Sequence, residues 1–115
     1  MNKLFLICIL FVLLQAPVVS LSAGVSHDGE RLFNAHCASC HGMKGVGTVK
    51  GPPLVHNIYN PNHHADITFR WAVERGVKAH HWNFGDMPKQ GGVKQQEVEA
   101  IIKYVRDIQK EAGIY

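Results

Sequence analysis

One pentapeptide, CASCH at residues 37–41, constrains this chain more than any other feature. It sets two cysteines three positions apart and places a histidine directly after the second one. Three kinds of site use such a spacing: a redox-active dithiol, half of a zinc site, and a position where a cofactor is covalently attached. Each interpretation requires different residues around the pentapeptide, so the rest of the sequence has to discriminate among them.

The N-terminal segment, residues 1–23, predicts export. It contains one lysine, an unbroken apolar run from Leu4 to Leu14, and then a stretch rich in small residues. A helical run of this length spans roughly 16 Å, about half of the hydrocarbon core of a bilayer, which is typical of a signal peptide. We expect cleavage after Ser22 or Ala23, and an uncleaved anchor is the alternative. A removed leader predicts a periplasmic protein without a stable membrane span.

The remaining chain, residues 24–115, is expected to be a single domain. Without Lys3 its formal charge falls from +3 to +2, and its basic residues are scattered, so it lacks the basic stripe of a nucleic-acid-binding protein. An exported domain of this size has a marginal core of its own. The loop between Cys37 and Cys40 is too short for a disulfide to add much stability. A large buried cofactor is therefore expected to complete the core.

The apolar pattern predicts an all-α domain with long loops. The clearest helix lies within residues 93–113, where one face carries a stripe of five apolar residues: Val98, Ile101, Ile102, Val105 and Ile108. A first helix is expected within 26–42, ended by Gly42, and another within 63–76, ended by Gly76. Residues 42–62 and 77–92 are rich in glycine, asparagine and proline, which favours loops.

This helical context discriminates among the interpretations of CASCH. A redox dithiol requires a Cys-x-x-Cys that opens a helix after a strand, whereas this one falls at the end of a helix, where the dipole disfavours a thiolate. A zinc site requires a second compact pair of ligands, and residues 24–115 contain no further cysteine. Cys-x-x-Cys-His is the signature of c-type haem attachment. Cys37 and Cys40 would bond to the two vinyl groups of one haem c, and His41 would bind the iron.

With this motif in place, the chain resembles the class I cytochrome c family over roughly residues 27–112. Gly29 and Phe33 resemble the glycine and the aromatic residue of the family's first helix, and Ile101 and Tyr104 resemble their packing partners in its last helix. The resemblance implies the cytochrome c fold. In that fold the first and last helices cross tightly at the glycine, and long loops wrap one covalently bound haem.

Two further motifs supply haem contacts under this resemblance. GPPL at 51–54 resembles the family's Gly-Pro-x-Leu. It implies that the carbonyl of Pro52 accepts a hydrogen bond from the nitrogen of His41 that does not bind iron, and that Leu54 packs on the haem. GDMP at 85–88 resembles the short bacterial methionine-ligand motif. It implies that Met87 is the second axial ligand.

The surroundings of the haem leave several alternatives open. His80 or His81 is the rival to Met87 for the second axial position, and bis-histidine ligation would lower the reduction potential that methionine raises. Phe69, Trp82 and Phe84 are expected to wall the pocket. The candidate donors to the haem propionates are three side chains: Trp82, Arg70 and His81.

The remaining charged residues and histidines carry weaker predictions. Four lysines come from the two loops that are expected to surround the exposed haem edge, where they would attract an acidic redox partner: Lys44, Lys50, Lys78 and Lys89. A scattered solvated surface is the alternative for them. The eight histidines raise the possibility of a second metal site, but no carboxylate lies at ligand spacing, so we expect them to be solvated surface residues instead. Adjacent histidines such as His63–His64 and His80–His81 also point in different directions, so they rarely chelate one ion together.

Together these features predict an exported, monomeric, mono-haem c-type cytochrome that carries single electrons between partner redox proteins. It would be an electron carrier rather than an enzyme. One alternative is a haem subunit fixed in a membrane or periplasmic oxidoreductase complex. Another is a sensor of a gas or a peroxide, in which the sixth iron ligand leaves to admit the small molecule.

Overall fold

The computed structural model describes residues 24–115, so the leader expected at 1–23 lies outside the described residues. The elements follow in the order α1 (Gly24–His36), α2 (Ala38–His41), η1 (Met43–Gly45), η2 (Asn57–Tyr59), α3 (Asp66–Arg75) and α4 (Gln95–Glu111), where η marks a single 3₁₀ turn. Within 24–115 there is no strand, only two isolated bridges, which confirms the all-α prediction. No helix in that range is long and apolar enough to cross a bilayer.

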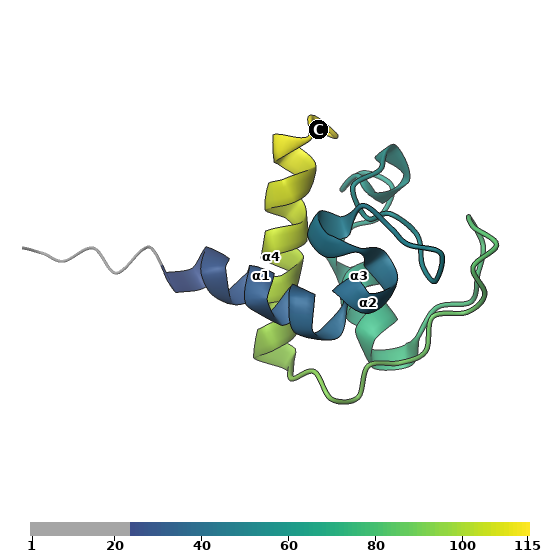
Figure 1. Ribbon diagram of the computed structural model, residues 1–115, viewed down its shortest axis with the longest axis horizontal. Coiled ribbons are helices and arrows are strands. Elements are labelled where there is room, and N and C mark those ends of the chain that lie inside the picture. Colours follow the sequence, from purple (N-terminus) through teal and green to yellow (C-terminus); the bar gives the residue numbers. More distant parts are fainter. Residues whose placement is uncertain (1–23) are drawn as a thin grey trace, which may run out of the picture.

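Helices α1 and α4 cross at Gly29 (Figure 1). A Cβ atom placed on Gly29 would collide with the carbonyl oxygen of Ala100 and would lie only 2.9 Å from the Cβ of Tyr104. The ring of Phe33, which is fully buried, packs against the ring of Tyr104 with 5.4 Å between centroids. The tight crossing implied by the resemblance is therefore present, and it requires a residue without a side chain at position 29.

Helix α4 supplies most of the core. All five residues of its predicted apolar stripe are buried, from Val98 to Ile108, which confirms the helical periodicity. Three of them, Ile101, Val105 and Ile108, pack with buried residues from the rest of the chain: Leu32, Phe33 and Leu54. Helix α4 therefore packs against both α1 and the loop that carries Leu54.

The predicted first helix is interrupted at the pentapeptide. Helix α1 ends at His36, and α2 follows as a single turn after Cys37. Gly42 ends α2 with φ of 76°, and Gly76 ends α3 with φ of 79°, as the sequence predicts. Both glycines adopt a left-handed backbone conformation that disfavours a side chain. The pentapeptide therefore begins at the break and continues as a short helix of its own, α2.

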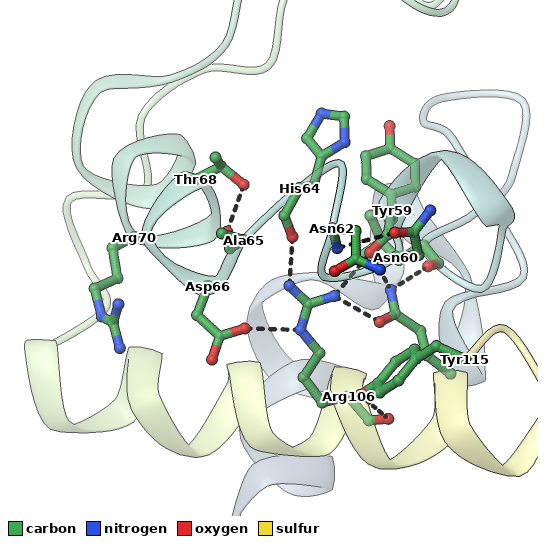
Figure 2. Close-up of polar contacts among 12 residues, drawn as sticks. Tyr59, Asn60, Asn62, His64, Ala65, Asp66, Thr68, Arg70, Arg106 and Tyr115 are labelled. Carbon is green, nitrogen blue, oxygen red and sulfur yellow. Dashed lines mark hydrogen bonds and ion pairs between the residues drawn. The ribbon is translucent and has the colours of Figure 1, made fainter.

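A buried arginine ties the loops to α4. Arg106 is only 9% exposed, and its guanidinium donates to the carbonyl oxygens of Tyr59 (2.7 Å) and His64 (2.5 Å) and to a carboxylate oxygen of Asp66 (2.7 Å), as Figure 2 shows. It also donates to the side-chain oxygen of Gln109 at 2.7 Å. This network fixes the segment 59–66, which connects η2 to α3, against the last helix.

Candidate functional site

A cavity of about 640 Å³ lies between the pentapeptide, the loop at 50–54, α3, the segment 76–90 and α4. Its walls are mostly apolar. All six residues predicted to bind the cofactor line it: Cys37, Cys40, His41, Pro52, Leu54 and Met87. The aromatic residues predicted to wall the pocket line it as well: Phe69, Trp82 and Phe84. The sequence-predicted site residues therefore meet in one place.

The two cysteines are free thiols in this cavity. Cys37 is half-buried and Cys40 is exposed. Burial, with a smaller contribution from the neighbouring Cys40, raises the pKa of the Cys37 thiol to about 11. At neutral pH this thiol is protonated, which is unsuited to a redox dithiol that attacks as a thiolate. Within residues 24–115 neither cysteine belongs to a cluster of three metal-ligating side chains. Both observations favour attachment over the other two interpretations.

His41 is held in one tautomer. Its Nδ1 lies 2.9 Å from the carbonyl oxygen of Pro52, and because that oxygen can only accept, Nδ1 carries the hydrogen. Nε2 is left with the lone pair that a metal ligand needs. Burial lowers the pKa of His41, and the hydrogen bond to Pro52 opposes this in part. Gly51 permits the approach of the Pro52 loop, since a Cβ there would lie 2.9 Å from the carbonyl oxygen of Cys40.

Met87 is positioned by its backbone. Its N–H and its carbonyl oxygen pair with those of Val77 at 2.9 Å each, which forms an isolated bridge just after α3. Asp86 accepts a hydrogen bond from the N–H of Ala79 at 2.9 Å and closes the same loop further. The backbone of Met87 is therefore held in place at the cavity. His80 and His81 also line the cavity, and they lie in the exposed part of the same loop.

The polar groups at the cavity differ from the predicted set. The indole N–H of Trp82 is buried and has no hydrogen-bond partner. Such a group destabilises the fold unless something bound in the cavity accepts from it. Arg70 instead pairs with Glu99 through contacts of 2.5 and 2.7 Å, and it does not line the cavity, so it is not placed to bind a propionate there. Of the four predicted lysines, Lys50 and Lys78 line the cavity.

Four of the histidines predicted to be solvated surface residues gather together: His63, His64, His80 and His81. All of them except His63 line the cavity. The ring centroids of His63 and His81 lie 5.3 Å apart, and those of His80 and His81 lie 4.3 Å apart. Partial desolvation, followed by the neighbouring imidazoles, lowers the pKa of His81. Burial lowers the pKa of His64, the hydrogen bond to Ile58 opposes this in part, and the nearby imidazoles and Arg106 lower it further. The sequence signal was the recurrence of the His-His pair at 63–64 and 80–81, in two loops whose proximity only the fold establishes.

The model of the cytochrome c family matches residues 26–109, which is well over half of the chain. The chain belongs to the cytochrome c family. Membership implies a haem-binding electron-transfer protein with covalently bound haem c and redox partners. No curated protein and no solved structure matches the chain.

The cavity fits the cofactor that the family implies. It combines free thiols at Cys37 and Cys40, an imidazole with an available Nε2 at His41, and a thioether at Met87. The unpartnered N–H of Trp82 is a donor that a haem propionate can satisfy. Thioether bonds, imidazole and methionine sulfur are the attachments and axial ligands that c-type haems use. The residues present therefore match the chemistry of haem c in each of these respects.

Proposed function

We propose that this cytochrome c is an exported, monomeric, mono-haem carrier of single electrons between partner redox proteins. One haem c would be attached through Cys37 and Cys40, and His41 and Met87 would hold its iron. The observation that carries the proposal is the arrangement of His41. Its Nδ1 donates to Pro52 at 2.9 Å, and the same cavity is lined by both thiols and by the only described methionine that reaches it.

The bound haem supplies one-electron exchange between Fe(II) and Fe(III). The protein's own contribution is to hold the ligands still. His41 keeps one orientation because the carbonyl of Pro52 accepts from its Nδ1. Met87 is held by paired backbone hydrogen bonds to Val77. An apolar wall that includes Leu54 and Phe69 lowers the local dielectric, which disfavours the additional charge of the ferric state and raises the potential.

The test compares Met87→Ala with two matched variants, Met43→Ala and His81→Ala. Met43 is 60% exposed and does not line the cavity, so its removal should leave the spectrum unchanged. The wild type should show the weak long-wavelength band of sulfur bound to ferric iron and should resist carbon monoxide in the ferrous state. Only Met87→Ala should remove the band, admit carbon monoxide and lower the midpoint potential.

Two results would contradict the carrier proposal. If the wild type binds carbon monoxide readily at neutral pH, the sixth position is labile and a sensor of small molecules becomes the better hypothesis. If His81→Ala rather than Met87→Ala changes the spectrum, the second ligand is the histidine. His81 is a rival ligand because His80 and His81 line the same cavity as Met87.

The proposed export has its own test. Mass spectrometry of the protein recovered from the periplasm should give the mass of a chain that begins near residue 23 or 24, plus one haem. A full-length chain in the membrane fraction would contradict a free carrier and would favour a haem subunit fixed to a membrane complex. The redox partners are proposed to be acidic around the docking face, since Lys50 and Lys78 lie at the cavity.

A further inference from the structure

We propose that His63, His64 and His81 form a second metal site, distinct from the iron, that binds a divalent first-row transition ion of the kind that prefers imidazole, with Cu²⁺ held more tightly than Zn²⁺. One ring nitrogen from each of the three residues lies within 4.8 Å of the others. His63 and His64 come from the loop before α3, and His81 comes from the loop after it. The fold therefore brings two separate His-His pairs to one place.

One pair of the nitrogens has the spacing of metal ligands. The Nε2 atoms of His63 and His81 are 3.4 Å apart. Two ligands at ~2.0–2.1 Å from a tetrahedral ion lie ~3.3–3.4 Å from each other. Without an ion, the same contact is within reach of an N–H···N hydrogen bond. The pair is already at the separation that an ion between the two nitrogens requires, and the His64 nitrogen, within 4.8 Å of the others, has to move closer to complete the set.

One of the three ligands, His64, has its tautomer set in the way that metal-binding histidines require. His64 Nδ1 lies 2.7 Å from the carbonyl oxygen of Ile58, so it carries the hydrogen and leaves Nε2 with its lone pair. His80 has the same arrangement with the carbonyl oxygen of Lys78, also at 2.7 Å. A ligating histidine almost always donates its other N–H to a carbonyl or a carboxylate. His80, whose ring packs 4.3 Å from that of His81, is placed beside the three ligands.

The loop that carries two of the ligands is held before any ion binds. Arg106 donates to the carbonyl oxygen of His64 at 2.5 Å, and Figure 2 shows the His64 ring turned away from the guanidinium. The side chain of Asn60 accepts from the N–H of His63 at 3.2 Å. Arg106 is itself paired with Asp66 at 2.7 Å, so its charge next to His64 is already compensated. A site with ordered ligand backbones loses less entropy on binding.

The chemistry of the ligands selects the ion. No carboxylate belongs to this cluster among residues 24–115, so the site offers neutral nitrogen atoms only. Mg²⁺ and Ca²⁺ require oxygen ligands, whereas Cu²⁺, Ni²⁺ and Zn²⁺ bind imidazole well, with Cu²⁺ highest in the usual affinity order. His63 and His81 are exposed, so hydrophobic burial does not account for their gathering. The three nitrogens leave at least one coordination position for water or a partner's side chain.

The experiment uses the haem-loaded protein after treatment with a chelator. Calorimetric titration with CuSO₄ and with ZnCl₂ should give one tight site per chain, and electron paramagnetic resonance of the Cu²⁺ form should show nitrogen ligands. His63→Ala and His81→Ala should each weaken binding by at least about tenfold, the loss expected even for a residue that only supports a ligand. Unchanged far-UV circular dichroism and thermal unfolding show that each variant is folded.

The matched control is His36→Ala, since His36 is an exposed histidine outside the cluster. It should bind both ions as the wild type does. The proposal is overturned if the wild type takes up no ion at a stoichiometry of one, or if the cluster variants bind as tightly as the wild type. Equal losses in His36→Ala and His81→Ala would also overturn it, because they would show binding to surface histidines in general.

Discussion

Replacing Arg106 with methionine tests the network that fixes the loop 59–66 to α4. Methionine keeps an apolar stem of similar length and removes the guanidinium. The change leaves four acceptors without their donor: the carbonyl oxygens of Tyr59 and His64, a carboxylate oxygen of Asp66 and the side-chain oxygen of Gln109. We expect a large loss of stability because the bond to Gln109 is buried and the other three are part-buried.

The magnitude follows from what each acceptor can do afterwards. Hydrogen bonds to a charged group contribute about 1.5–3 kcal/mol each, so the four sum to about 6–12 kcal/mol before compensation. Asp66 is half-exposed and regains water, and the carbonyl of Tyr59 keeps a donor from Gln109 at 3.2 Å. The carbonyl oxygen of His64 and the side-chain oxygen of Gln109 are left without a donor, and each bears the free-energy cost of an unsatisfied acceptor. The net loss should be about 2–6 kcal/mol, from two acceptors left unsatisfied at about 1–3 kcal/mol each, which is a large part of a domain's total stability.

The measurement is equilibrium unfolding of the haem-loaded protein in guanidinium chloride, followed by far-UV circular dichroism. The matched control is Lys103→Met on the same helix, whose pair with Asp107 at 2.7 Å is solvent-exposed and should contribute only about 0.3–0.5 kcal/mol. A loss below about 1 kcal/mol for Arg106→Met, the range of a surface pair, would refute the reasoning. Equal losses in the two variants would do the same.

Two further predictions concern the helix crossing and the histidines. Gly29→Ala should cost about 1–3 kcal/mol of unfolding free energy through overpacking against Ala100 and Tyr104, whereas Gly91→Ala, which meets nothing within 4 Å, should be close to neutral. Stability without added metal should fall as the pH drops below the ordinary imidazole pKa of about 6.5. The pKa values of His64 and His81 are lowered in the fold, so the unfolded chain binds more protons there and the loss continues down to their folded values. His81→Asn should reduce that slope in pH-dependent denaturation curves, and an unchanged slope would contradict the assignment.

The parts of the fold that the sequence predicts are those set by local pattern. The stripe in α4 shows its period because a helix that buries one face must repeat its apolar residues every three to four positions. Gly42 and Gly76 end their helices because each adopts a positive φ that other residues avoid. CASCH indicates its chemistry because the spacing of the two thiols and the imidazole lies within one turn.

The parts that it does not predict depend on distant contacts. Arg106 and Gln109 look like surface residues of α4 in the sequence, yet both are buried, since carbonyl oxygens of residues 54–64 accept from them. The sequence of a helix does not show which distant carbonyl groups its polar side chains bind, because that depends on where the loop lies in the fold. The gathering of His63, His64 and His81 has the same origin, because α3 separates the two loops in sequence while the fold brings their tips together.

The central claim is that one haem is covalently bound through Cys37 and Cys40. Its most direct test is the intact mass of the exported protein under denaturing conditions, after extraction with acidified acetone. The wild type should retain the mass of one haem, and the double variant Cys37→Ala, Cys40→Ala should have the mass of the bare chain. A wild-type protein that loses its haem in acidified acetone, and so has the mass of the bare chain, would contradict the account.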